Sequence, residues 1–211
     1  MSAYLIVKIL AEHEAKTLLA RYDIPIPVFK TIVPSDDLDA VSIPFPVALK
    51  VSSPEVLHKT DAGGVLLNIW NKDDLAHEYN EFQKKFPGKT CIVEAMAPHG
   101  IECIAGIVDD TTFGMCIMVG IGGIFTELYN DVSFRMLPIT SKDAEEMLED
   151  LQARRIFHGY RVAVDRKALV SLLLKLSRMA EELHIQQFDL NPIFLYEHGL
   201  TVVDAKGIIG E

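Results

Sequence analysis

Two long apolar segments joined by a short polar turn constrain the fold of this chain more than any other feature. The segments are "IECIAGIVDD" (101–110) and "GMCIMVGIGG" (114–123), and the turn lies in "DDTTFG". A connection this short joins antiparallel strands, because parallel strands need a long crossover. A second pair closes the chain, where "FDLNPIFLYEHGLTVVDAKGII" (188–209) predicts two strands around the turn "YEHG". The sequence therefore predicts antiparallel pairing rather than a regular βαβ alternation.

Helices and further strands surround these hairpins. Apolar residues recur at helical spacing in four segments: 10–24, stopped by Pro25 and Pro27; 71–86, with Asn71 as N-cap; 141–155, with Ser141 as N-cap; and 165–183. Shorter apolar runs predict strands at 45–52, 63–70 and 90–97. This order of elements indicates an α+β fold.

Charge and cysteine usage exclude several classes of protein. The 211 residues carry a formal net charge of −10, which argues against a general nucleic-acid binder but leaves small anions open. The three cysteines lie in apolar runs without metal-binding spacing, which favours buried thiols in a reducing compartment. The N-terminal segment lacks the layout of a signal peptide, and no stretch has the roughly 20 apolar residues of a membrane span. We expect a cytoplasmic protein with no nucleic-acid or membrane partner.

Two glycine-bearing segments could bind a ligand. In "LKVSSPEVLHKTDAGGV" a strand ends near Lys50, and the following loop closes on Gly63 and Gly64. An ammonium group beside glycine backbone suits a phosphate, although the segment matches neither a Walker loop nor a dinucleotide fingerprint. Glycines recur at the end of the strand in "VGIGGIFTELYNDVSFR" (119–135). A bulged turn explains these later glycines about as well as the approach of a ligand does.

The C-terminal hairpin carries a candidate metal site. Asp189 and Asn191 alternate along one predicted strand and so point to the same side, and Asp204 lies on the neighbouring strand. Carboxylate and amide oxygens that converge from adjacent strands suit Mg²⁺. The alternative is a hairpin with polar residues on a solvated face, but the surrounding residues are mostly apolar, which favours the metal site.

Taken together, these segments resemble the ATP-grasp (beta) subunit of ADP-forming acyl-CoA synthetases, such as ADP-forming acetate–CoA ligase, and they are similar to the beta chain of succinyl-CoA ligase. The resemblance runs nearly end to end and is carried by "LKVSSPEVLHKTDAGGVLLNI", "FGMCIMVGIGGIFTELYNDVSFRMLPIT" and "FDLNPIFLYEHGLTVVDAK". It implies an ATP-grasp fold of two lobes with nucleotide bound between them: a smaller lobe at 20–92 and a larger lobe at 93–211. Residues 1–19 are expected to form an N-terminal helix on the larger lobe.

The resemblance also implies roles for individual residues. Lys50 would bind the nucleotide phosphates beside Gly63 and Gly64, and His58 would pass on a phosphoryl group. The adenine would be held by main-chain contacts at Glu94 and Met96, and the ribose by Glu102. Asn191 and Asp204 would bind Mg²⁺, and Asp189 would orient a phosphohistidine that arrives from a partner. The implied partner is a CoA-binding alpha subunit with its own phosphorylatable histidine, and the implied substrates are ATP and ADP.

The chain departs from this family at two places, the segment before "TCIVEAM", which looks trimmed, and one loop. Members usually continue after the central helix with a Gly-x-Arg-Gly-x-Pro loop, whereas "HGYRVAVD" is shorter and keeps Gly159 and Arg161. Two alternatives therefore stay open beside the synthetase. One is another ATP-grasp carboxylate ligase, and the other is a non-catalytic nucleotide-binding or scaffold subunit.

Overall fold

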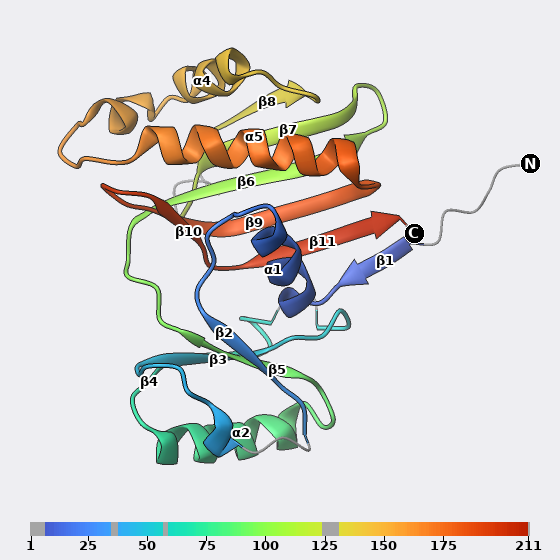
Figure 1. Ribbon diagram of the computed structural model, residues 1–211, viewed down its shortest axis with the longest axis vertical. Helices are drawn as coiled ribbons and strands as arrows, with labels where there is room; N and C mark the ends of the chain where they lie inside the picture. The colour runs from blue at the N-terminus through green and yellow to red at the C-terminus, as the bar shows by residue number, and fades with distance from the viewer. Residues whose placement is uncertain (1–6, 35–37, 57–58, 124–130, 211) are drawn as a thin grey trace, which may run out of the picture. The chain divides into compact units, whose positions relative to one another are not determined.

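The computed structural model describes residues 7–34, 38–56, 59–123 and 131–210 (Figure 1). It divides into two compact units. The first unit comprises Met1–Leu10, Ala15–Ile26 and Pro98–Glu211, and the second comprises Ala11–Glu14 and Pro27–Ala97. The lobe boundary expected from the sequence, between residues 92 and 93, stays a prediction.

The first unit is built on one large antiparallel sheet. Its strand order is β1-β11-β9-β6-β7-β8, and β10 also pairs with β9. The central pair β6–β7 is the hairpin predicted from the sequence, with Cys103 opposite Ile121 and Asp110 opposite Gly114. The strands are β1 (Val7–Leu10), β6 (Ile101–Asp110), β7 (Gly114–Ile121), β8 (Val132–Met136), β9 (Ile185–Leu195), β10 (Leu200–Val202) and β11 (Ala205–Gly210).

Helices α4 (Ser141–Asp150) and α5 (Arg166–Glu182) cover one face of this sheet (Figure 1). Helix α5 presents a continuous apolar side whose leucines are almost fully buried against β6 and β7. Burial of a leucine side chain stabilises a fold by roughly 1.5–3 kcal/mol, so this layer is the main core of the unit. The remaining helical elements of the unit are most of α1 (Glu12–Arg21) and the 3₁₀ helix η2 (Arg154–His158).

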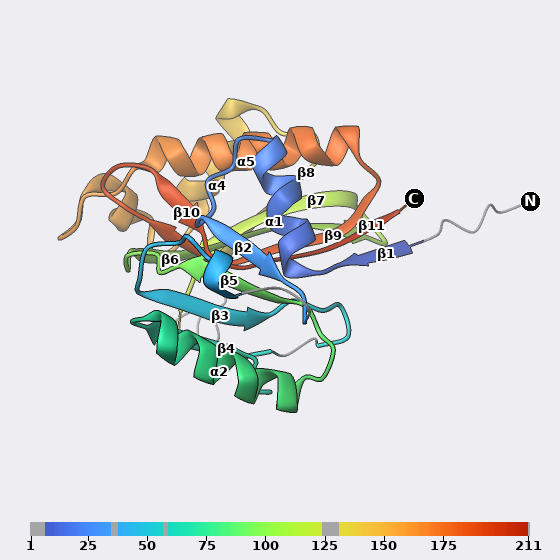
Figure 2. The same ribbon diagram turned by 60° about the horizontal axis from the view of Figure 1, so that its bottom comes forward.

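The second unit is a four-stranded antiparallel sheet in the order β2-β5-β3-β4. Helix α2 lies along one face of this sheet (Figure 2), where its Leu75, Tyr79 and Phe82 pack on the apolar side chains of the strands. The side chain of Asn71 accepts a hydrogen bond from the Asp74 N–H and begins the helix, as the sequence predicts. The elements are β2 (Phe29–Ile32), the 3₁₀ helix η1 (Leu38–Ala40), β3 (Val47–Val51), β4 (Val65–Ile69), α2 (Lys72–Lys85) and β5 (Cys91–Ala95).

Three local expectations from the sequence were wrong. Val7–Leu10 form strand β1, paired with β11, and not the start of a helix. Helix α4 is capped by Thr140 rather than Ser141: the Thr140 hydroxyl accepts from the Asp143 N–H while the Asp143 carboxylate accepts from the Thr140 N–H. The return strand of the last hairpin is interrupted, so it forms two strands, β10 and β11.

The three cysteines are free thiols buried in the two sheets, as their apolar contexts predict. Burial raises the pKa of Cys103 to about 12 and that of Cys91 to about 11, and it also raises the pKa of Cys116. Because the thiolate is the reactive form, we expect none of the thiols to react with a disulfide reagent within minutes in the native protein. All three should react after denaturation in urea. Rapid reaction of a native thiol would contradict the burial described here.

Within the described ranges, no helix is both long and apolar enough to cross a membrane.

Candidate functional site

Lys50 lies on β3 of the second unit and is almost fully buried, with 3% of its surface exposed. Its ammonium group forms ion pairs with Glu94 of β5 and with Glu12, the latter at 3.1 Å from Nζ to Oε1. The pair with Glu94 follows from register: Lys50 lies opposite Ile92, and a diagonal neighbour two residues along the facing strand is within reach of long side chains. Lys50 is therefore a charged group fixed inside the second unit.

Glu12 and Lys59 complete a cluster of four buried charges that the sequence analysis missed. Glu12 is 5% exposed, and its second carboxylate oxygen forms an ion pair with the ammonium of Lys59, which is 6% exposed. Buried charges are tolerated in proteins when they are paired, and each of these four side chains has an oppositely charged partner within the cluster. His58, which precedes Lys59, lies outside the described residues.

The glycine pair beside this cluster has a structural reason of its own. Gly63 adopts a positive φ of 62°, a conformation that side chains rarely take. A Cβ atom at Gly64 would lie 2.6 Å from the Val51 side chain and 3.0 Å from the carbonyl oxygen of Lys59. Gly64 thus allows the loop to pack tightly on the end of β3, and this requirement holds with or without a ligand.

The main chain at the expected adenine contact is part of the sheet. Glu94 pairs with Phe29 on one side and Ala48 on the other. Two residues on, the Met96 N–H donates to the carbonyl oxygen of Pro46 at 3.2 Å. A base that bound to the Met96 N–H would replace this hydrogen bond.

The candidate metal ligands lie at an irregularity of β9 in the first unit. The register between β6 and β9 shifts next to these residues. Cys103 pairs with Ile193 and Ala105 pairs with Leu190, so one residue of β6 between these pairs faces two residues of β9. The extra residue makes a bulge over Asn191 and Pro192, and bulges next to functional sites commonly redirect a side chain. Phe188 and Leu190 are buried whereas Asp189 and Asn191 are more exposed, so the burial pattern follows the alternation expected from the sequence as far as Asn191.

The hairpin closes at this bulge and places Asp204 opposite Asn191. The Asn191 N–H donates to the Asp204 carbonyl oxygen at 3.2 Å, in the gap between β10 and β11. At the turn of the same hairpin, the Asp165 carboxylate accepts from the N–H of Gly199 and caps α5 by accepting from that of Ala168. These two hydrogen bonds, that from Gly199 above all, lower the pKa of Asp165. The hairpin is thus fastened to α5.

Asp189 adds a second carboxylate near this bulge. Its pKa is raised, first by burial and further by the negative charge of Asp204, while Lys206 opposes the shift. A bound cation would relieve the repulsion between these two carboxylates, and the residue types at Asp189, Asn191 and Asp204 suit Mg²⁺. Among the described residues, no group of three or more histidine, cysteine, aspartate or glutamate side chains is placed to hold a metal.

Glu102 of β6 lies beside the glycines at the end of β7. Its carbonyl oxygen accepts from the Gly122 N–H at 2.7 Å, and a Cβ atom at Gly123 would lie 3.2 Å from its carboxylate. These glycines thus leave space for the Glu102 side chain. Glu102 lies four residues before Gly106 on β6, and Gly106 pairs with Asp189 of β9. The residues Glu102 and Asp189 therefore lie at different positions along the sheet.

The loop that the sequence predicts to be shorter than in the family follows the 3₁₀ helix η2. Gly159 ends that helix with a φ of 80°, and Arg161 adopts a positive φ of 64°. The Arg161 guanidinium stacks over the Tyr160 ring, 5.4 Å from its centroid. The loop is therefore a compact turn.

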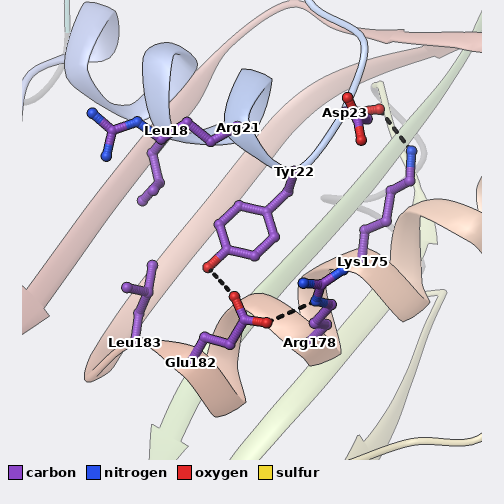
Figure 3. A pocket seen from close by; sticks show the side chains of 8 residues that line it. All are labelled: Leu18, Arg21, Tyr22, Asp23, Lys175, Arg178, Glu182 and Leu183. Atoms are coloured by element: carbon purple, nitrogen blue, oxygen red, sulfur yellow. Dashed lines mark hydrogen bonds and ion pairs between the residues drawn. The ribbon is translucent and has the colours of Figure 1, made fainter.

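A pocket of about 350 Å³ in the first unit contains none of the expected site residues (Figure 3). It lies between the end of α1 and the end of α5. Tyr22 Oη donates to Glu182 at 2.9 Å, Arg178 Nε donates to the same carboxylate at 2.7 Å, and Lys175 donates to the Asp23 carbonyl oxygen. Its polar groups thus bind largely to one another, and we assign no ligand to it.

Comparison with known proteins identifies the class. Residues 7–209 match the ATP-grasp domain, so the chain belongs to the ATP-grasp family. More particularly, it is 39% identical over 214 residues to the beta subunit of ADP-forming acetate–CoA ligase I from Pyrococcus furiosus, covering 95% of this chain and 91% of that subunit.

Two further proteins are similar. ADP-forming acetate–CoA ligase II from Archaeoglobus fulgidus is 39% identical over 208 residues, and this chain spans 31% of its length. A solved structure of the dinucleotide forming acetyl-coenzyme A synthetase 1 from Ca. Korarchaeum cryptofilum has a TM-score of 0.83 and 37% identity, over 96% of this chain and 93% of that chain. That structure is a complex with coenzyme A and Mg-AMPPCP, in which a phosphohistidine segment points towards the nucleotide-binding site. The fold and family expected from the sequence are thereby confirmed.

Proposed function

We propose that this chain is the nucleotide-binding subunit of an ADP-forming acyl-CoA synthetase. The reaction is acyl-CoA + ADP + phosphate ⇌ carboxylate + CoA + ATP. The observation that carries the proposal is the match to the beta subunit from P. furiosus, which extends over nine tenths of both chains. The name of that relative, a subunit beta, supports a partner subunit for this chain. The longer A. fulgidus relative, of which the chain spans about a third, is likewise an ADP-forming acetate–CoA ligase.

The nucleotide and its metal would be bound by the residues described above. Lys50 would neutralise the phosphates, Glu94 and Met96 would hold the base through their main chain, and Glu102 would contact the ribose. Asn191 and Asp204 would hold Mg²⁺. The cation would supply charge neutralisation, on which phosphoryl transfer depends more than on covalent help from the protein. The Mg-AMPPCP complex of the K. cryptofilum relative supports this assignment.

Phosphoryl transfer would depend on His58 and on a partner. A neutral imidazole is nucleophilic near neutral pH, which suits a histidine for passing on a phosphoryl group. His58 would be that residue in this chain, and Asp189 would orient the phosphohistidine of a CoA-binding alpha subunit. The resulting enzyme would be a hetero-oligomer, and the buried free thiols favour the cytoplasm as its compartment.

ATP formation in the assembled enzyme tests the proposal. The chain is co-expressed with a CoA-binding subunit from the same source, and ATP is measured after addition of acetyl-CoA, ADP, phosphate and Mg²⁺. We expect ATP formation that requires both subunits and acyl-CoA. If the purified complex binds ADP but forms no ATP with any of a series of acyl-CoA substrates, the chain is not the subunit of such an enzyme.

A further inference from the structure

One carboxylate joins the two buried lysines of the second unit. Glu12 accepts from Lys50 through Oε1, at 3.1 Å, and from Lys59 through Oε2. The ammonium groups are therefore held next to each other on the two oxygens of a single side chain. Glu94 forms a further ion pair with Lys50.

Hydrogen bonds of neighbouring residues hold the segments that carry these three side chains. The His13 N–H donates to the hydroxyl of Ser52 at 3.0 Å, and the His13 ring lies 2.8 Å from the same oxygen. This contact fastens the residue next to Glu12 to the end of β3, two positions beyond Lys50.

Lys59 is fixed by the glycine loop. Its carbonyl oxygen accepts from the Gly64 N–H, and the Gly64 carbonyl oxygen in turn accepts from the Val51 N–H at 2.9 Å. Since a side chain at Gly64 would collide with Val51 and with the Lys59 carbonyl, the glycine is what allows Lys59 to approach β3. Both lysines thus have fixed main-chain positions beside the same strand.

We propose that Glu12 is a positioning residue that holds Lys50 and Lys59 side by side, and that the two ammonium groups together bind the phosphate groups of the nucleotide. The inference rests on the proposed function and adds Lys59 to the nucleotide-binding residues and Glu12 to the residues that position them. A pair of adjacent cations suits a multiply charged phosphate chain better than a single lysine does.

Stability alone is a poor reason for this cluster. Removing charges from water costs several kcal/mol for each ion, and replacement of buried ion pairs by apolar side chains is often neutral or stabilising. Two lysines from separate segments nevertheless converge on one glutamate. A site that must receive an anion needs such charges, and the carboxylates offset the cost of their burial when no ligand is bound.

Comparison of ADP with adenosine separates a role in phosphate binding from a structural role. The 211-residue chain is titrated with ADP in the presence of Mg²⁺, and adenosine, which lacks phosphate, is measured as a competitor. We expect Lys59→Met to weaken ADP binding by about 10- to 100-fold, on the scale of a charged hydrogen bond. Glu12→Gln should weaken it by about tenfold, because both lysines remain but are no longer held together. Adenosine binding should not change in either variant.

The double variant Glu12→Gln/Lys59→Met guards against a loss of folding. This variant removes one charge of each sign. We therefore expect it to be less destabilised, relative to the wild type, than either single variant. Its affinity for ADP should remain low. Lys84→Met, which breaks an exposed ion pair with Glu81 on α2, is the matched control and should bind ADP normally.

Two results would overturn the inference while leaving the proposed function intact. One is wild-type affinity for ADP in folded Lys59→Met or in the double variant. The other is an equal loss of ADP and adenosine affinity, which would assign the cluster a purely structural role. A wild-type chain that binds no ADP would instead contradict the proposed function, and the inference with it.

Discussion

Replacement of His58 by alanine should abolish ATP formation from acyl-CoA, ADP and phosphate in the assembled enzyme. The loss should exceed about a thousandfold, because removal of a nucleophile leaves no other group to carry the phosphoryl intermediate. ADP should still bind, since the proposed contacts of the base, the ribose and the metal do not involve the imidazole. The measurement combines an ATP-formation assay with a titration of ADP on the same preparation.

The control for this variant is His77→Ala. His77 is an exposed histidine on α2 of the same unit, and its loss should leave ATP formation unchanged. If His58→Ala forms ATP at the wild-type rate, His58 has no part in phosphoryl transfer. A parallel loss of ADP binding would show that the residue acts in binding rather than in transfer.

Replacement of Lys50 by methionine should destabilise the protein by about 3–5 kcal/mol, the cost of removing one partner from a buried ion pair. Methionine fills a similar volume, but it leaves the carboxylates of Glu12 and Glu94 with one ammonium group fewer between them. Unfolding in urea, followed by circular dichroism, measures the change. The same variant should lose ADP affinity if Lys50 binds the phosphates.

Lys84→Met is again the matched control, because the Lys84–Glu81 pair is exposed. Exposed ion pairs contribute only about 0.2–1 kcal/mol, so the midpoint of unfolding should hardly move. Equal effects of the two substitutions would contradict the buried cluster around Lys50.

Local patterns in the sequence were sufficient for most of the fold. The turn at 109–114 predicts the β6–β7 hairpin because the two strands are neighbours in sequence. The start of α2 at Asn71 was likewise evident, since the capping hydrogen bond joins residues three apart. Strand β1 could not be recognised in this way. It is four residues long, and its partner β11 lies at the other end of the chain.

Only part of the candidate site could be predicted from local sequence patterns. Lys50, Asp189 and Asn191 stand out because polar residues interrupt apolar strands. Glu12 looks like an ordinary acidic residue in the first turn of a helix, and its ion pair joins it to Lys59, 47 positions away. The bulge at Asn191 was also missed, because it depends on the register between β9 and β6. Long-range pairing, rather than local pattern, decides both features.

Calorimetric titration of the chain with ADP, with and without Mg²⁺, tests the central claim most directly. The account predicts binding that requires the metal and is strongly weakened in Asn191→Ala. Gln187→Ala, which removes an exposed amide from the same strand β9, should bind like the wild type. Binding of equal strength without Mg²⁺ and in Asn191→Ala, or no binding by the wild-type chain, would contradict the account.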